Sequence, residues 1–231
     1  MKKTLFLTKT LPKYFWVILL FLLTLGCKKD NQTDFTTSVI VDERDGQRYK
    51  IVKIGKQWWM AENLNYCPSS GSWYYDNDSI TYSKNHGRLY LWSTVMNGAT
   101  SSDKNPSKVR GISPKGWHIP SVSEWEQLLN YLRSNGLNVD DLKEAGTEHW
   151  TEPNAGTNRT LFNAIPAGTV YNDGNSFANI TYQTTFLTST LTTVCSGDAV
   201  WGYGIDCDKS YTRKVPLGLE NGWSVRCVKD K

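Results

Sequence analysis

The clearest candidate for chemistry is a histidine among tryptophan and proline residues in the stretch GISPKGWHIPSVSEWEQLL (residues 111–129). A catalytic histidine needs an activated partner, such as a serine or cysteine nucleophile, and an acid that orients it. No G-x-S-x-G elbow occurs, and no spacing rule places an acid beside His118. We therefore predict that His118 makes a local structural hydrogen bond and that the chain has no catalytic residue.

The residues after His118 predict a helix. Ser121 and Glu124 have the spacing of a capping box, in which each side chain accepts a hydrogen bond from the other residue's backbone N–H. An apolar stripe follows at helical spacing, and Asn135-Gly136 supplies the stop. The stripe consists of Val122, Trp125, Leu128, Leu129 and Leu132. His118 is thus expected in an extended segment that leads into this helix.

A second candidate site is the stretch CSGDAVWGYGIDCDKSYTRK (residues 195–214), which combines aromatic rings with carboxylates. Its candidate ligand-binding residues are Trp201, Tyr203, Asp206, Asp208 and Tyr211. Ring faces bury the apolar patches of sugars or peptides, while acids accept hydrogen bonds from hydroxyl groups. The alternative is a glycine-rich loop that packs its own aromatic residues. The GYG triplet lacks the spacing and the following helix of a phosphate-binding loop.

The N-terminus has the pattern of an export signal. Four lysines precede the apolar run FWVILLFLLTL (residues 15–25), which is too short to span a bilayer. The ending LLTLGC resembles the lipobox of bacterial lipoproteins, although Thr24 stands where leucine is usual. We predict a signal peptide over residues 1–26, lipidation of Cys27 and a flexible tether over residues 27–37. The alternatives are an ordinary cleaved signal with an unmodified cysteine, or an uncleaved anchor.

The positive net charge of the chain comes from the predicted signal peptide. Residues 1–26 contain four lysines and no acid, so their removal lowers the formal net charge from +4 to zero. No sustained basic patch remains, and we expect no nucleic-acid partner. The predicted membrane contact is made through the N-terminal lipid alone.

Four cysteines remain in the predicted mature chain: Cys67, Cys195, Cys207 and Cys227. An even number in an exported protein favours two disulfides, for which three connectivities exist. Free thiols are the alternative. Zinc binding lacks support because no C-x-x-C pair occurs, and we expect neither a metal nor a cofactor.

Residues 38–231 are predicted to form one α+β domain. Asp45-Gly46, the run NDGN (residues 172–175) and Asn221-Gly222 are typical of hairpin turns, and Gly55 of a further turn. Helices are expected over residues 88–98 and 138–146, in addition to the one after Ser121. The final run WSVRCV (residues 223–228) alternates like a strand with one buried face.

Several segments, in the same order, resemble the signature pieces of the Fibrobacter succinogenes major paralogous domain. They are DGQRYKIVKIGKQWWMAENLNY, HGRLYLW, GISPKGWHIPSVSEWEQL, AGTEHW, LFNAIPAG and NGWSVRCVKD. The resemblance covers nearly all of the predicted mature chain. It implies a C-type-lectin-like fold with short helices and a loop-rich antiparallel sheet, in a secreted or lipid-anchored surface protein. It carries over no catalytic residue.

The resemblance also bears on the cysteines. In that fold the last cysteine closes the domain onto an early one and the middle two staple a loop, which implies the pairs Cys67–Cys227 and Cys195–Cys207. The family commonly has cysteine where this chain has Ser113, and this departure weakens the first pairing. Tyr74 and Tyr82 replace another pair of family cysteines together.

The triplet Glu152-Pro153-Asn154 matches the calcium-binding and sugar-binding triplet of C-type lectins. The downstream Trp-Asn-Asp triplet and the dense acidic surroundings that calcium requires are absent from the sequence. We therefore predict a turn here rather than a metal site.

Together these features predict a lipid-anchored protein of the cell envelope. It would be an outer-membrane lipoprotein facing the cell surface or the periplasm, with a lectin-like domain that binds a glycan or protein partner without catalysis. Two alternatives stay open: an enzyme of the formylglycine-generating or glycan-cleaving type, and a structural envelope component without a ligand.

Overall fold

The computed structural model describes residues 35–230. The predicted signal peptide, the lipidation of Cys27 and most of the predicted tether lie outside the described residues. The last part of that tether is structured: the strand β1 begins at Thr37, one residue earlier than expected, and Phe35 packs against the core. Pairing of Thr37 with Val52 accounts for the earlier start.

The first sheet has five strands in the order β1-β2-β3-β13-β6. Their bounds are β1 (Thr37–Val41), β2 (Arg48–Ile54), β3 (Gln57–Met60), β13 (Val228–Lys229) and β6 (Trp117–His118). The turns predicted at Asp45-Gly46 and at Gly55 join β1 to β2 and β2 to β3. Gly46 and Gly55 both have a positive φ, which explains why glycine stands there.

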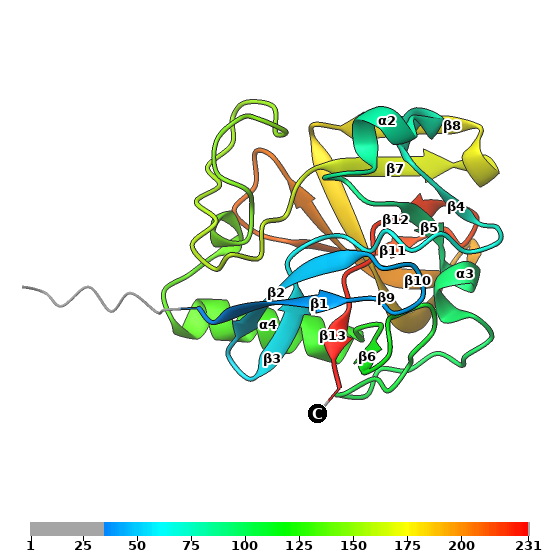
Figure 1. Cartoon of the computed structure of the whole chain (residues 1–231), viewed down its shortest axis with the longest axis horizontal. Coiled ribbons are helices and arrows are strands. Elements are labelled where there is room, and N and C mark those ends of the chain that lie inside the picture. Colours follow the sequence, from blue (N-terminus) through cyan, green and yellow to red (C-terminus); the bar gives the residue numbers. More distant parts are fainter. Residues whose placement is uncertain (1–34, 231) are drawn as a thin grey trace, which may run out of the picture. The chain divides into compact units, whose positions relative to one another are not determined.

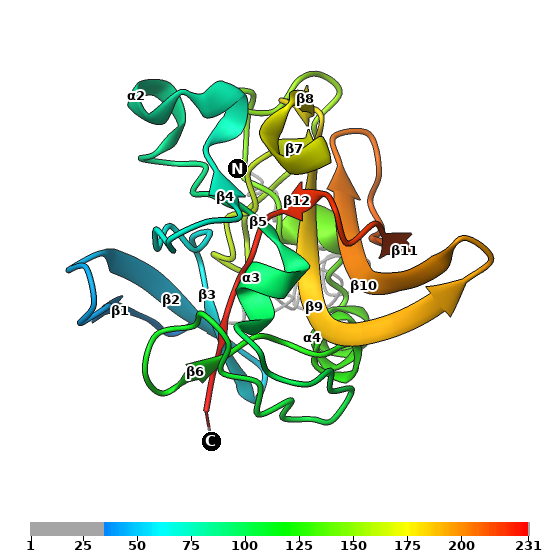
Figure 2. The same ribbon diagram turned by 90° about the vertical axis from the view of Figure 1, so that its right-hand side faces the viewer.

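The second sheet follows the order β11-β10-β9-β7-β12-β5-β4, and β8 pairs with β7 beside this path. The bounds are β4 (Ser72–Trp73), β5 (Leu89–Leu91), β7 (Ala167–Tyr171), β8 (Ser176–Ile180), β9 (Gln183–Val194), β10 (Gly197–Asp206), β11 (Arg213–Leu217) and β12 (Gly222–Trp223). All of its pairs are antiparallel except β7–β9. The hairpin of β9 and β10 is its largest part and curves across the molecule (Figure 2).

Helix α4 (Val122–Ser134) begins and ends as the sequence predicts. The Glu124 N–H donates to Ser121 Oγ at 3.2 Å, and the Ser121 N–H donates to Glu124 Oε2 at 3.1 Å. All five residues of the predicted stripe are buried. Trp125 stacks on Tyr203 with ring centroids 5.1 Å apart, so the helix covers a core to which both sheets contribute.

The remaining helices are short: α2 (Ser79–Tyr82), α3 (Trp92–Met96) and single 3-10 turns at Tyr75–Asn77, Val139–Asp141 and Asn172–Gly174. The helix expected over residues 88–98 is reduced to α3, because Leu89–Leu91 pairs with β4 and β12 as strand β5. Likewise only one 3-10 turn stands within residues 138–146. Long sheets with few short helices make this an α+β domain (Figure 1).

Two expectations about the C-terminal segment are wrong. Asn221-Gly222 is not a hairpin turn, because β12 pairs with β5 and β7 rather than with β11. Residues 223–228 do not have one buried face: Ser224 and Arg226 are as buried as Val225. The segment passes from the second sheet at β12 to the first at β13, so protein covers it on both sides.

The two predicted disulfides are also wrong, since all four described cysteines are free. Cys195 lies in the turn before β10 and Cys207 directly after it. The ten-residue strand between them separates their Cα atoms by about 30 Å, whereas a disulfide needs less than about 7 Å. Cys67 is exposed, whereas Cys227 is fully buried beside the Ser113 hydroxyl.

Candidate functional site

The five candidate ligand-binding residues after Cys195 do not form one site. Tyr203 is buried, and its hydroxyl donates to Glu126 Oε1 at 2.6 Å. Asp206 is buried and accepts two hydrogen bonds from Arg213, at 2.6 and 2.7 Å. The functional groups of Tyr203 and Asp206 are therefore already bonded to other residues of the domain.

The other three candidates are spread from strand β10 to the segment before β11. Trp201 is half-buried on strand β10, where Lys214 Nζ lies 5.0 Å from its ring centroid. Asp208 follows the strand and accepts from Lys209 Nζ at 2.9 Å. Tyr211 is exposed beside the C-terminal end of α4. Residues 197–206 form strand β10, which pairs with a neighbour on both edges, and not a loop closed by a disulfide. Its aromatic residues Trp201 and Tyr203 therefore lie along the sheet.

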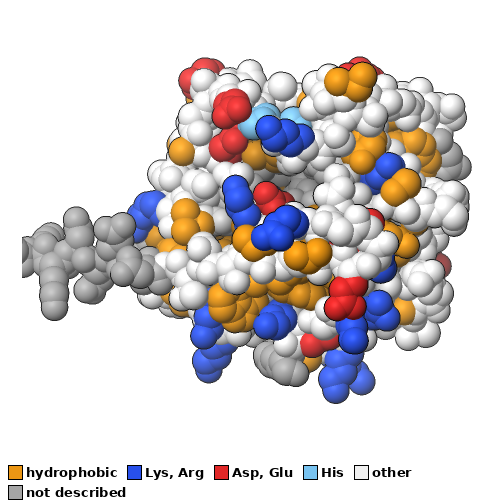
Figure 3. Space-filling view, in the orientation of Figure 1, with side chains coloured by type: hydrophobic (Ala, Val, Ile, Leu, Met, Phe, Trp, Pro, Cys, Tyr) orange, Lys and Arg blue, Asp and Glu red, His pale blue; other side chains and the backbone are white. Residues whose placement is uncertain are grey.

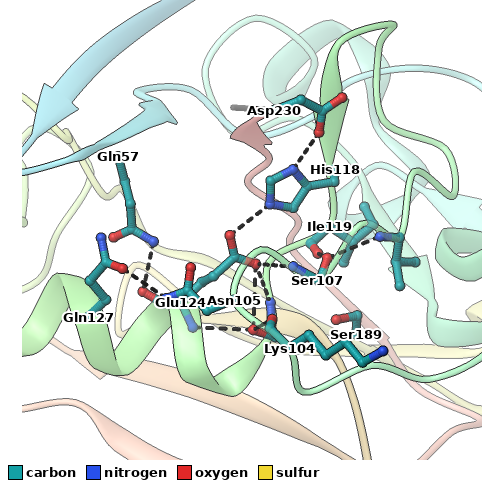
Figure 4. Close-up of polar contacts among 12 residues, drawn as sticks. Gln57, Lys104, Asn105, Ser107, His118, Ile119, Glu124, Gln127, Ser189 and Asp230 are labelled. Carbon is teal, nitrogen blue, oxygen red and sulfur yellow. Dashed lines mark hydrogen bonds and ion pairs between the residues drawn. The ribbon is translucent and has the colours of Figure 1, made fainter.

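His118 has the structural position that the sequence predicts. Its ring is 1% exposed and lies between two carboxylates, with Nε2 2.8 Å from Glu124 Oε1 and Nδ1 2.6 Å from Asp230 Oδ1 (Figure 4). Burial lowers the pKa of His118, but hydrogen bonds and charge from Glu124 and Asp230 outweigh it, so the pKa is raised overall. The imidazole thereby links strand β6, the start of helix α4 and the C-terminus.

The triplet Glu152–Asn154 forms a turn that holds a neighbouring loop. Asn154 Nδ2 donates to the carbonyl oxygens of Glu144 and Gly146, at 3.0 and 2.7 Å. These two bonds fix the loop that carries Glu144, Glu148 and His149. The predicted turn is confirmed. Its Asn154 holds the backbone of the loop that carries the acidic side chains Glu144 and Glu148.

Those acidic side chains line one end of a groove on the face shown in Figure 3. The groove consists of three adjoining hollows that all include Glu62 in their walls, and we call it the Glu62 groove. The first hollow is lined by Lys50, Ala61, Glu62, Lys84, Asn85, Glu144, Glu148, His149, Asn163, Ile165 and Arg226. Acidic, basic and histidine side chains thus gather around one depression of the surface (Figure 3).

The neighbouring hollows extend the groove in two directions. One runs along the edge strand β1 past Val39 and Leu161, which are 46% and 43% exposed. The other runs past Asn65 and Tyr74. Glu62 itself accepts a hydrogen bond from the Lys50 N–H at 2.7 Å, so strand β2 fixes the carboxylate at the centre.

Arg226 forms the floor of the first hollow. It is 1% exposed, and its guanidinium donates to Asn63 Oδ1 at 2.9 Å, to Asn163 O at 2.8 Å and to Phe162 O. No carboxylate of residues 35–230 forms an ion pair with it, and burial lowers its pKa to about 9. The arginine therefore ties the segment before β13 to the loop after Asn158.

Three further candidate residues, which the sequence analysis missed, line the first hollow. His149 Nδ1 lies 2.9 Å from both carboxylate oxygens of Glu144, and His149 Nε2 lies 3.2 Å from Asn85 Nδ2. Each of Glu144, Glu148 and His149 contributes one potential ligand atom to a cluster in which these atoms lie within 4.8 Å of one another. The only local signal in the sequence is the adjacency of Glu148 and His149.

A comparison with protein-family models matches residues 52–229 to the Fibrobacter succinogenes major domain. The chain belongs to this family. The match begins within β2 and ends with β13. It includes the second sheet, helix α4, the first sheet apart from β1 and the start of β2, and every residue of the first hollow except Lys50. Neither the comparison with curated proteins nor that with solved structures gave a match.

Two of the segments that resemble this major domain meet at the groove. HGRLYLW begins at His86 and AGTEHW ends just after His149, and the rings of these histidines pack edge to face with centroids 5.1 Å apart. Among the helices of residues 35–230, none is long and apolar enough to cross a membrane.

Proposed function

We propose that this member of the Fibrobacter succinogenes major domain family is a lipid-anchored protein of the bacterial cell envelope. Its domain binds a glycan or protein partner in the Glu62 groove without catalysing a reaction. The observation that carries the proposal is the junction of three hollows at one carboxylate. A long groove of this kind suits an extended ligand better than a small substrate.

The lining of the groove matches the needs of such a ligand. Glu62, Asn85 and Asn163 offer hydrogen-bond acceptors and donors for hydroxyl or amide groups. Val39 and Leu161 add exposed apolar surface in the hollow along β1. Binding sites for sugars and peptides combine these two kinds of surface.

The envelope location is supported by the sequence pattern around Cys27. That cysteine lies eight residues before Phe35, the first residue that the structure describes. A lipid on Cys27 would hold the domain near the bilayer surface, within reach of envelope polysaccharides and proteins. A C-type-lectin-like arrangement of the two sheets is part of this proposal.

The enzyme alternative predicts a different chemistry in the same groove. Glycan cleavage needs two carboxyl groups, one of which donates a proton. Here Glu62 accepts from a backbone N–H and Glu144 lies against His149, so both carboxylates act as acceptors in the fold. This favours recognition over proton transfer.

The test uses the full chain, extracted from membranes in detergent. We expect binding on a panel of envelope glycans or in crosslinking to envelope proteins, and a loss of at least about tenfold in affinity for Glu62→Gln. Glu220→Gln is the matched control, since Glu220 is an exposed glutamate outside the groove. Equal binding by both variants contradicts the proposal. Release of shortened glycans would show instead that the protein is a glycan-cleaving enzyme.

The anchor is tested separately. The intact mass of the membrane-extracted chain should show an N-terminus at Cys27 that carries acyl groups. Cys27→Ala should release the protein from the membrane fraction or leave its signal uncleaved. An unmodified Cys27 in a membrane-free protein contradicts the anchor and leaves the groove proposal intact.

A further inference from the structure

The loop before Trp150 brings two glutamates and a histidine together in a geometry that suits a metal ion. His149 Nδ1 lies 2.9 Å from each oxygen of Glu144. Two donors at right angles on one ion, each bound at about 2.1 Å, stand about 3 Å apart. The Glu144 and His149 atoms are therefore already spaced as neighbouring ligands.

Glu148 supplies a third potential ligand atom and a second carboxylate charge in the cluster. Its carboxylate lies within 4.8 Å of the ligand atoms of Glu144 and His149. It makes no hydrogen bond or ion pair with any other described residue. Two carboxylates this close repel each other, and one histidine balances at most one of them. Glu148 is exposed, so its side chain is free to turn toward an ion held by the other two.

An independent observation comes from His86, which lies beside the cluster. Its side chain is buried, with 8% exposed, and its ring packs edge to face against His149. The Nδ1 atom of His86 is buried and has no hydrogen-bond partner within the described chain. Such a group costs free energy unless something bonds to it. His86 thus leaves an unpaired polar atom in the ring that packs against His149.

Lys84 and Lys50 also line this hollow, but neither forms an ion pair with the cluster.

We propose that Glu144, Glu148 and His149 bind one divalent cation of the zinc class, with water completing its coordination. Two carboxylate oxygens and one imidazole nitrogen form a donor set that suits zinc and related transition metals, whereas calcium and magnesium prefer oxygen alone. The site goes beyond the proposed binding function and does not depend on it. It lies at one end of the Glu62 groove, where the ion's open positions face solvent.

Binding changes the protonation of His149 in a defined way. His149 Nδ1 faces the Glu144 carboxylate, and Nε2 faces the side-chain amide of Asn85. The metal takes the Nδ1 lone pair, so the proton moves to Nε2, and the Asn85 amide turns to present its oxygen to that N–H. Asn85 then orients the histidine ligand from the far side of the ring.

The experiment measures zinc binding to the full chain in detergent by equilibrium dialysis, metal analysis and titration calorimetry. Accessible thiols are first alkylated, because exposed thiols such as those of Cys67 and Cys195 can ligate added zinc. We expect one zinc ion per chain and a higher melting temperature with zinc. Glu148→Gln and His149→Gln should each lower the affinity by at least about tenfold and abolish the thermal shift.

Glu220→Gln is the matched control, since it removes the same charge at an exposed position outside the cluster. It should bind zinc like the parent chain. Glu148 is exposed, so its variant should keep the parent melting temperature without metal, which separates loss of binding from loss of folding. The absence of stoichiometric zinc, or equal affinity in Glu148→Gln and the parent chain, overturns the site. Neither result bears on ligand binding at Glu62.

Discussion

His118 Nε2 lies 2.8 Å from Glu124 Oε1, and this contact joins strand β6 to the first turn of helix α4. The other oxygen of Glu124 accepts from the N–H groups of Ser107 and Ser121. One carboxylate thus caps the helix, anchors a loop and holds a buried histidine (Figure 4). Asp230 secures the other side of the ring, so the final strand closes the same network.

The first prediction concerns the pH dependence of this network. The folded pKa of His118 is raised above the unfolded value of about 6.5. Its contribution to stability is therefore complete below about pH 6 and is lost as the pH rises through the folded pKa. We expect His118→Gln to lower the free energy of unfolding by roughly 3 kcal/mol at pH 6 and by less at pH 9. Denaturant titrations at both pH values measure the difference.

Asp230→Asn provides the comparison, because the Asp230 side chain is 53% exposed. It should cost about 1 kcal/mol or less. A His118→Gln penalty that is the same at pH 6 and pH 9 would show that the histidine acts through packing rather than charge.

The second prediction concerns the cap of helix α4. Ser121→Ala removes the acceptor for the Glu124 N–H, and we expect it to lower the free energy of unfolding by about 1 kcal/mol. Ser134→Ala, at the exposed last residue of the same helix, should have an effect within about 0.5 kcal/mol of zero. Equal effects of the two substitutions would contradict a capping role.

Helix α4 could be predicted from sequence because its signals are local. The capping box, the apolar stripe and the glycine stop all lie within residues 121–136, and each acts over one or two helical turns. The hairpin turns at Asp45-Gly46 and after Tyr171 are local in the same sense. Such features are readable without knowing the rest of the fold.

The sequence analysis missed features that depend on contacts between segments far apart in the chain. Residues 89–91 fit a helical face, yet strand β5 forms because β4 and β12 flank it. The alternation of residues 223–228 predicts an exposed position for Arg226. In the structure Arg226 is buried, and it bonds to Asn63, Phe162 and Asn163. Both outcomes depend on partners more than 15 residues away in the chain.

The candidate metal cluster was missed for the same reason. Glu144 and His149 could be called neighbours from sequence, but Asn85 and His86 lie some 60 residues earlier. The fold brings them together, because Asn154 holds the loop of Glu144 next to the segment after α2. The predicted binding loop differs from the structure in the opposite way, since residues 197–206 form a paired strand rather than a loop closed by a disulfide.

The third prediction concerns thiol reactivity. Cys67 and Cys195 are exposed and should react quickly with an alkylating reagent in the native protein. Burial raises the pKa of Cys207, and burial raises that of Cys227 to about 12, so both should react only after unfolding. Peptide mapping after brief alkylation identifies the labelled positions. A disulfide-linked peptide that joins Cys195 to Cys207 would contradict the pairing of strand β10.

The fourth prediction follows from the neighbour of Cys227. The Ser113 hydroxyl acts on the buried Cys227 thiol and opposes the rise of its pKa, so the two side chains are close. Ser113 is also the position at which the family resemblance of the sequence implies a cysteine. We expect Ser113→Cys to form a disulfide with Cys227 on mild oxidation. In the chain-entropy model a bridge across a loop of this length stabilises the fold by up to about 4–5 kcal/mol.

Non-reducing mass analysis detects the bridge, and melting temperatures with and without reductant measure its effect. Ser113→Ala is the matched control, because it removes a buried hydroxyl that has no hydrogen-bond partner among the described residues. That variant should be close to neutral in stability and insensitive to reductant. If Ser113→Cys stays reduced in the folded protein under oxidising conditions, the two side chains do not face each other and the placement of Cys227 is wrong.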